Sequence, residues 1–188
     1  MNKTSEPQDK EAILMKLAES AKSMPLIPEH GVADTLHVGI EDMPWVDLGN
    51  GAEIQLLHVD LAQGLWITRN RMQPGVAVEK HYHTGSVFAV TQKGRWYYKE
   101  TPDQINSPGS YLFEPPMSVH SLMVPEDQDG PTEVWFAVYG ANINLDDNNQ
   151  VTSIVDANAV LQGYRTYCDA LGLGYDKLIV VGENLTDD

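Results

Sequence analysis

Short segments of apolar or alternating residues, separated by turn residues, follow one another between residues 34 and 155. Glycine and proline recur between these segments, and both residue types favour tight turns. Many short strands at such spacing are typical of an antiparallel sandwich or barrel, so the sequence predicts an all-β fold over this range. The candidate strands are 53–60, 64–72, 86–91, 95–100, 110–114, 119–124 and 132–139.

A helical pattern precedes the strands. Residues 5–24 carry apolar side chains at a spacing of 3.6 residues, and Ser5 with Gln8 forms a capping box around Pro7. Prolines and a glycine then interrupt the pattern. We therefore expect an N-terminal helical extension over residues 1–33.

A second helical pattern follows the strands. Residues 156–171 place apolar side chains on one stripe, Asp156 suits the N-cap, and Gly172 suits the end of the helix. Residues 178–181 are apolar and suit a last short strand. We expect residues 156–188 to form a C-terminal helix and tail that pack on the barrel as one domain.

The chain of 188 residues is acidic, with 27 Asp and Glu against 12 Lys and Arg and a net charge of −15. Such a chain repels phosphate backbones and anionic lipid surfaces, so neither nucleic acid nor membrane is an expected partner. The N-terminus lacks the apolar core of a signal peptide, which suggests a cytoplasmic protein. The single cysteine, Cys168, excludes a disulfide within the chain, and we expect it to be a buried apolar residue.

Three of the six histidines have a spacing that suits a metal site. His81 and His83 are two residues apart, so on a β-strand both project from the same face, with Tyr82 on the other. A third imidazole, His120, on a neighbouring strand would complete one side of a metal site and leave the opposite side open. The alternative is three unrelated histidines on a solvent-facing sheet. His30, His37 and His58 have no evident partner, and we interpret them as surface or structural histidines.

Glycines and a proline stand at fixed distances from these histidines. The spacing resembles the two-part motif of the cupins, proteins built on a double-stranded β-helix or jelly-roll barrel. By this resemblance the fold is an all-β cupin barrel with flanking N- and C-terminal helices. The matching positions are Gly75, His81, His83, Gly94, Gly109, Pro115 and His120.

Two departures from the cupin motif bear on the site. Cupins usually carry a glutamate ligand shortly after the H-x-H pair, but Val87 and Phe88 stand there. Met117 and Val124 replace the usual glycine and asparagine of the second motif. The sequence therefore predicts three neutral imidazoles without a carboxylate. Such a set leaves the charge of a divalent ion uncompensated and favours an anionic, chelating ligand such as an enolate.

Glu114, six residues before His120, is the carboxylate closest to the predicted site in sequence. It could hydrogen-bond a ligating imidazole or a bound water. It could also bind the metal directly, or it could be a turn residue at the mouth of the barrel. The sequence leaves these alternatives open.

A wider resemblance runs through most of residues 40–165. The chain is similar to the cupin dioxygenases typified by 2,4'-dihydroxyacetophenone dioxygenase. The similar stretches are "WVDLGNG", "RMQPG", "HYHTGSVFAVTQKGRWYYKE", "PGSYLFEP", "TEVWFAVYGANINLD" and "DANAVL".

That resemblance implies a non-haem Fe(II) ion held by His81, His83 and His120. It also implies cleavage by O2 of a carbon–carbon bond next to a ketone, in an aromatic hydroxyketone or a diketone. Zn, Ni, Mn or Cu could occupy the same site in a purified sample. A homodimer or homotetramer is the expected assembly.

Further residues are candidates for catalysis or for the substrate pocket. Arg69 and Arg71 share one face of strand 64–72 and either hold an anionic oxygen in the cavity or face outward. We name Arg71 and Glu114 as catalytic candidates. Aromatic side chains suit the wall of a pocket for an aryl ketone or plain core packing, and a methionine near the third histidine would reshape that pocket. These are Phe88, Trp96, Tyr98 and Met117.

Two other functions compete with the dioxygenase. A cupin that binds zinc and senses or regulates without catalysis would use the same three histidines, because fold alone does not fix function. A metal-dependent isomerase or hydrolase of small carbonyl compounds would need a general base near the metal, and Glu114 could serve.

Overall fold

The structure is a computed structural model that describes residues 7–21 and 35–183. The chain divides into two compact units, Met1–Thr35 and Leu36–Asp188. In the first unit, α1 (Pro7–Ala21) lies inside the predicted helical range 5–24. The remainder of that range, including the capping residue Ser5, lies outside the described residues.

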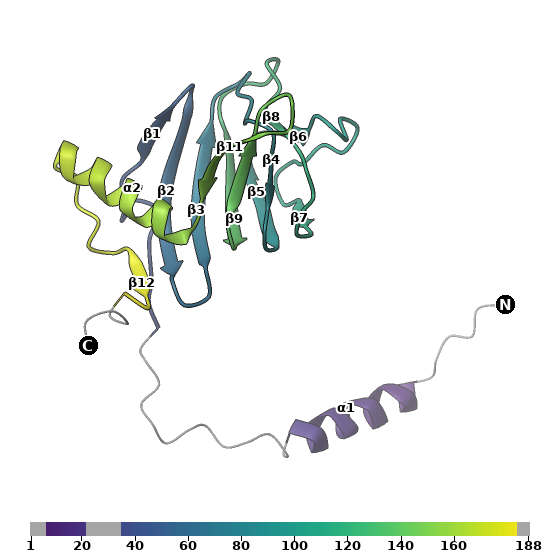
Figure 1. The fold of residues 1–188 in the computed structure, drawn as a ribbon. Helices are drawn as coiled ribbons and strands as arrows, with labels where there is room; N and C mark the ends of the chain where they lie inside the picture. The colour runs from purple at the N-terminus through teal and green to yellow at the C-terminus, as the bar shows by residue number, and fades with distance from the viewer. Residues whose placement is uncertain (1–6, 22–34, 184–188) are drawn as a thin grey trace. The chain divides into compact units, whose positions relative to one another are not determined.

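The second unit is built on a seven-stranded sheet (Figure 1). Its antiparallel strands run in the order β1-β2-β3-β9-β5-β7, and the short β12 adds in parallel to β2. The sheet therefore joins segments that are far apart in the sequence. The strands are β1 (Val46–Gly49), β2 (Ala52–Asp60), β3 (Leu65–Met72), β5 (Val87–Lys93), β7 (Tyr111–Glu114), β9 (Thr132–Tyr139) and β12 (Ile179–Val181).

Two smaller sheets complete the β-structure. One has three antiparallel strands in the order β11-β10-β4. The other pairs two very short strands, β6 with β8. The strands are β4 (His81–His83), β6 (Tyr97–Tyr98), β8 (Leu122–Met123), β10 (Asn142–Leu145) and β11 (Val151–Val155). One cavity is lined from the large sheet and from both small ones, so the three sheets enclose a common interior.

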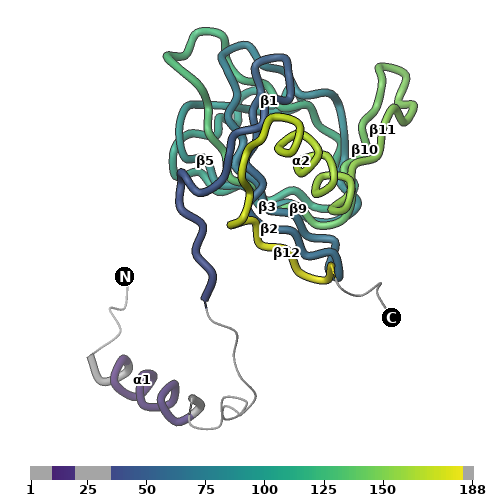
Figure 2. Tube along the Cα trace, turned by 90° about the vertical axis from the view of Figure 1, so that its left-hand side faces the viewer, coloured from purple at the N-terminus to yellow at the C-terminus, as the bar shows by residue number. Residues whose placement is uncertain are grey.

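The interior is apolar and formed by alternate residues of the strands. On β3, for example, Trp66 and Met72 are buried on the inner face. The C-terminal helix α2 (Ala157–Leu171) packs on β1, β2, β3 and β11 (Figure 2). Its buried side chains Leu161, Tyr164 and Cys168 belong to the same core cluster, so α2 covers the end of the large sheet formed by β1, β2 and β3.

Local signals explain the bounds of α2. The Asp156 side chain accepts a hydrogen bond from the backbone N–H of Ala159, and Gly172 takes the left-handed conformation that ends the helix. Both caps confirm the prediction, as does the burial of Cys168. The Tyr164 hydroxyl also donates to the carbonyl of Pro44, 2.6 Å away, which ties α2 to the segment before β1.

The all-β prediction is confirmed, with differences in detail. The segments 95–100 and 119–124 contain only the two-residue strands β6 and β8. Strands β10 and β11 were not predicted, because Asn142, Asn144 and Ser153 interrupt the apolar pattern. Neither described helix has the length and apolar character needed to cross a bilayer.

Candidate metal centre

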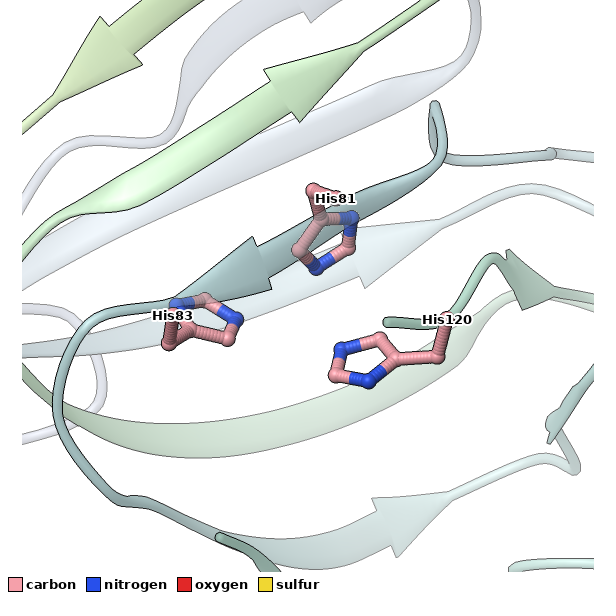
Figure 3. Close-up of side chains that lie close together, drawn as sticks. All are labelled: His81, His83 and His120. Carbon is pink, nitrogen blue, oxygen red and sulfur yellow. The ribbon is translucent and has the colours of Figure 1, made fainter. Parts of the chain in front are cut away.

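Two backbone features bring the three predicted histidines together. His81 and His83 project from the same face of β4, and both are buried while Tyr82 between them is half-buried. His120 is joined to His81 by an antiparallel bridge in which each backbone N–H donates to the other's carbonyl at 3.0 Å. The imidazoles therefore face one another from neighbouring segments (Figure 3).

The geometry of this cluster suits a metal ion. Each histidine offers one nitrogen, and these three nitrogens lie within 4.8 Å of one another. A common ion at ordinary Zn–N or Fe–N bond lengths of about 2.0–2.1 Å would separate its ligands by less than that. The predicted grouping of His81, His83 and His120 is thus present in the structure.

Unpartnered polar atoms test whether the residues fit a cation. The Nδ1–H of His81 donates to the carbonyl of Glu79 at 2.6 Å, which leaves the lone pair of Nε2 free. At the centre of the cluster, Nε2 of His120 and Oε2 of Glu114 are buried without a hydrogen-bond partner. Leaving such atoms unpaired costs about 1–3 kcal/mol each, and a cation among them would satisfy the lone pairs. The donor set fits a divalent metal.

The protonation states agree with metal binding. Burial lowers the pKa of His81, and burial together with the neighbouring imidazoles lowers the pKa of His83 to about 4 against the attraction of Glu114. Both rings are therefore neutral near pH 7. The neutral imidazole is the form that coordinates a metal.

Glu114 contributes a carboxylate to the centre. Its Oε2 lies 3.4 Å from Nε2 of His83 and 3.2 Å from Nε2 of His120, and only 4 % of the residue is exposed. Burial by itself raises the pKa of this carboxyl, but the contacts with His120 and Tyr98 outweigh it and leave the pKa lowered. Glu114 is therefore an ionised group inside the site and not a turn residue at the barrel mouth.

The metal-capable cluster consists of the three histidines alone, as predicted. The carboxylate of Glu114 nevertheless lies against two of them, for a reason visible in the strand register. Val87 and Phe88 occupy the positions where cupins carry their glutamate, and of these the buried Val87 on β5 pairs directly with Glu114 on β7. Directly paired residues of an antiparallel sheet project from the same face about 5 Å apart. The neighbouring strand thus supplies a carboxylate on the face where β5 has valine.

Tyr98 supports Glu114 and His120 together. Its hydroxyl donates to Oε1 of Glu114, and its ring stacks on the His120 imidazole with centroids 4.2 Å apart. Burial and the charge of Glu114 raise the pKa of Tyr98 well above its ordinary value, so the hydroxyl keeps its proton and remains a donor. Tyr98 also lines the cavity, where the sequence had suggested an aromatic wall.

A cavity of about 240 Å³ opens beside the histidines. This volume is below the roughly 300–1,000 Å³ of sites for drug-sized ligands, so it suits a molecule of about one ring. Its wall is mostly apolar, with a few polar groups. The lining residues are Leu48, Ile54, Trp66, Thr68, Asn70, Met72, Val78, His81, His83, Tyr98, Glu114, Leu122, Phe136, Val138, Asn142 and Val160.

Neither predicted arginine lines this cavity. On β3, Thr68 and Asn70 face the cavity, so Arg69 and Arg71 at the alternate positions face the other side of the sheet. Arg71 pairs with Glu133 at 3.1 Å and lies over the ring of Trp45. These contacts occupy the guanidinium outside the cavity, which corrects the idea that it holds an anionic oxygen there.

Arg69 is engaged in the same way. Its Nη1 donates to Oε1 of Gln55 at 2.7 Å, on the sheet face away from the cavity. The side chain is therefore a partner of β2 and not part of the candidate pocket.

Three other predicted pocket residues also lie elsewhere. Phe88 packs against Phe113 on the side of β5 opposite to the buried Val87. Trp96 is fully buried in the core, and its Nε1–H donates to the Thr91 hydroxyl at 2.8 Å. Met117 is 61 % exposed. Of the aromatic candidates, Tyr98 alone lines the cavity.

Sequence reasoning missed the polar lining residues Thr68, Asn70 and Asn142. One sequence signal could have found Asn70. It shares a strand face with the apolar Met72, so a polar residue stands at a position where core packing would favour an apolar one. Among the remaining histidines, His37 is exposed and His58 is half-buried, and neither belongs to the metal cluster found in the described part of the chain. His30 lies outside the described residues.

Comparisons with known proteins identify the fold. Similar solved structures include a protein of unknown function with a cupin-like fold from Ralstonia eutropha JMP134, at 31 % identity and a TM-score of 0.73. That match covers 80 % of this chain and 94 % of the other. An RmlC-like cupin from the same organism has 25 % identity and a TM-score of 0.71, covering 75 % and 91 %.

A third similar structure is an acetylacetone dioxygenase from Acinetobacter johnsonii. It has 16 % identity and a TM-score of 0.63, with 77 % of this chain and 99 % of that chain covered. At this identity the likeness shows the fold alone. A search of curated proteins found no match.

A family description matches the chain directly. Residues 33–141, more than half of the sequence, match the family described as the ChrR cupin-like domain. The β-sheets of the second unit agree with that match, and the three histidines lie within the matched residues. The chain therefore belongs to the ChrR cupin-like family and carries a three-histidine site that could bind a metal.

Proposed function

We propose that this protein is a non-haem Fe(II) dioxygenase that uses O2 to cleave the carbon–carbon bond next to a ketone, in a hydroxyacetophenone-like substrate or a diketone. The observation that carries the proposal is a cluster of three histidines and one ionised carboxylate at a small, mainly apolar cavity. The acetylacetone dioxygenase of similar fold adds support at the level of the fold.

The charges of the site favour a monoanionic ligand. The neutral imidazoles of His81 and His83 add no charge, and the ionised Glu114 contributes one negative charge. With a divalent ion, one further negative charge from an enolate or a deprotonated hydroxyketone would make the site neutral. Bound iron would supply Lewis-acid polarisation of the ketone and a path for electrons.

The cavity wall excludes water and holds the apolar part of the ligand. Trp66, Phe136 and Val138 come from β3 and β9 and face the cavity. Apolar walls raise the strength of the electrostatic interactions at the metal because they exclude a high-dielectric solvent. An aryl or alkyl ketone of about one ring fits this environment.

One polar group of the wall favours a hydroxylated ketone over a plain diketone. The Oδ1 of Asn70 is buried without a hydrogen-bond partner and belongs to a residue that lines the cavity. A hydroxyl on the ligand could donate to it, and a ligand that lacks the hydroxyl would leave the amide unpaired. We therefore expect the hydroxylated ketone to be the better substrate.

The proposal is tested by metal content and oxygen uptake. The variants are His81→Ala and His120→Ala, with His37→Ala as the control because His37 is exposed and outside the cluster. Purified anaerobically with iron, the two cluster variants should lose both bound iron and oxygen uptake with hydroxyacetophenones, while His37→Ala keeps both. Unchanged iron content in both cluster variants would contradict the ligand assignment.

One observation favours a second function, a zinc-binding cupin that senses or regulates. The Oε2 of Glu114 lies 3.2 Å from Nε2 of His120, beside the three-histidine cluster, and its addition to the three histidines would give the four protein donors typical of closed structural zinc sites. In that case Glu114 would occupy the position that a substrate needs. Iron-loaded protein that consumes no oxygen with any hydroxyketone or diketone, but binds zinc tightly, would establish this alternative.

A further inference from the structure

We propose that Asn142 is a positioning residue of the metal centre, whose amide oxygen accepts a hydrogen bond from the Nδ1–H of His83 when Nε2 of that ring holds the metal. The proposal rests on metal binding by the three histidines. It does not depend on which metal is native or on dioxygenase activity.

The strand register places Asn142 beside His83. The two residues pair directly between β10 and β4. The backbone hydrogen bonds from Thr84 N–H to Ala141 and from Leu145 N–H to Lys80 lie at the flanking positions, so Asn142 and His83 form a non-hydrogen-bonded pair. Side chains of such a pair are closer than those of a hydrogen-bonded pair and lie on the same face.

Both side chains carry an unpartnered polar atom, and the two atoms are complementary. Nδ1 of His83 and Oδ1 of Asn142 are buried and have no hydrogen-bond partner. In a neutral imidazole whose Nε2 lone pair faces the metal, Nδ1 carries the hydrogen and is a donor. An amide oxygen is an acceptor only. One hydrogen bond would satisfy both atoms.

The orientation of the Asn142 amide is determined by its other neighbours. Its Nδ2 donates to Oδ1 of Asn144 at 2.9 Å, and Nδ2 of Asn144 donates to the hydroxyl of Ser153 at 2.7 Å. Because the amide nitrogen donates to Asn144, the amide oxygen is the atom that remains available to accept a hydrogen bond from His83. The chain of hydrogen bonds extends from β11 through β10 to the edge of the metal site.

His83 needs such an acceptor more than His81 does. Nδ1 of His81 already donates to the Glu79 carbonyl, which fixes that ring and its tautomer. Histidines that bind metals almost always donate the other N–H to an acceptor of this kind, and its loss weakens metal affinity 10- to 100-fold. Asn142 supplies to His83 what the backbone supplies to His81.

The experiment measures the affinity of the purified protein for Zn²⁺ alone, by competition with a chromophoric chelator at fixed pH. Asn142→Leu removes the acceptor at similar volume, and Asn142→Asp keeps an acceptor oxygen. Asn70→Leu makes the same chemical change at another cavity position, where the paired residues are Ile54 and Val134 and no histidine. Circular dichroism of the metal-free variants checks that each one folds.

We expect Asn142→Leu to bind Zn²⁺ 10- to 100-fold more weakly than the unaltered protein, and Asn142→Asp and Asn70→Leu to stay within about threefold. Equal affinity of Asn142→Leu and the unaltered protein would overturn the proposal. So would equal weakening by Asn70→Leu, because that result would mean that cavity polarity matters and not the contact with His83.

A crystal structure of the unaltered protein with Zn²⁺ tests the same claim without a variant. We expect the Oδ1 of Asn142 within about 3.2 Å of Nδ1 of His83. A longer separation, with a water or ligand on either atom, would overturn the proposal. An unaltered protein that binds no Zn²⁺ would refute the metal site itself. Zinc binding by a protein whose iron-loaded form takes up no oxygen would refute only the dioxygenase.

Discussion

Val87 and Glu114 face each other across the antiparallel pair of β5 and β7. Through this pairing, β7 supplies the carboxylate that the residues after the H-x-H pair do not. The centre thus combines three histidines with a glutamate that comes from a different strand than the one expected of a cupin.

A carboxylate moved from β7 back to β5 should restore metal binding. We expect Glu114→Val to bind Zn²⁺ or Fe(II) 10- to 100-fold more weakly, because Glu114 is the ionised group nearest to two of the histidines. The double variant Val87→Glu with Glu114→Val should regain most of that affinity. Calorimetric titration with the metal provides the measurement, and a double variant no tighter than Glu114→Val would argue against equivalence of the two positions.

Removing one hydroxyl should reveal how Tyr98 acts. Tyr98→Phe retains a ring that can stack on His120 but loses the hydrogen bond to Glu114, and this bond contributes to the lowered pKa of that carboxyl. We expect the acidic limb of the pH–rate profile to move to higher pH and kcat/KM to fall about tenfold, as for loss of a hydrogen bond to a charged group.

Tyr97→Phe is the matched control for that change. Tyr97 neighbours Tyr98 on β6 and does not line the cavity. An unchanged pH profile in Tyr98→Phe would show that the Tyr98 hydroxyl does not act on Glu114.

The stability of the metal-free protein should depend on pH through His83. Its pKa of about 4 in the folded protein is below the value near 6.5 of an unfolded chain, so the unfolded state binds more protons between these limits. The stabilisation from keeping His83 neutral is present above pH 6.5 and is lost as pH falls toward 4. This stabilisation amounts to roughly 3 kcal/mol.

Urea unfolding of chelator-treated protein at several pH values measures this dependence. His83→Asn should flatten the curve between pH 6.5 and 4, while His37→Asn should not, because His37 is exposed. A His83→Asn protein with the same pH dependence as the unaltered protein would contradict the assigned cause.

Arg71 should be dispensable for catalysis. Its guanidinium pairs with Glu133 and Glu53 and lies over Trp45 on the face of β3 away from the cavity. We expect Arg71→Leu to keep kcat/KM within about twofold and to lower the free energy of unfolding by up to about 1 kcal/mol, since the ion pairs are partly exposed. A tenfold or greater loss of activity with unchanged iron content would show that Arg71 takes part in catalysis.

Features that depend on neighbouring residues in the sequence could be predicted. The alternation of β2, β3 and β9, the caps of α2 and the shared face of His81 and His83 all follow from local periodicity. The glycine and proline spacing around His120 extended the prediction to the third histidine.

Features that depend on the pairing of distant strands could not be predicted from the sequence. The position of Glu114 opposite Val87 requires the register of β5 and β7, and that of Asn142 beside His83 requires the register of β4 and β10. The facing of Arg69 and Arg71 depends on which side of β3 is covered by the smaller sheets. Alternation alone defines two faces without saying which one encloses the cavity.

Oxygen uptake by iron-loaded protein distinguishes a ketone-cleaving dioxygenase from a cupin that binds metal without catalysis. The protein is purified anaerobically, loaded with Fe(II), assayed for metal content and then mixed with hydroxyacetophenones and β-diketones in an oxygen electrode. We expect consumption of one O2 per ketone cleaved, with the hydroxylated aryl ketone as the better substrate. Protein with one iron per chain that consumes no oxygen with any of these ketones would contradict the dioxygenase activity.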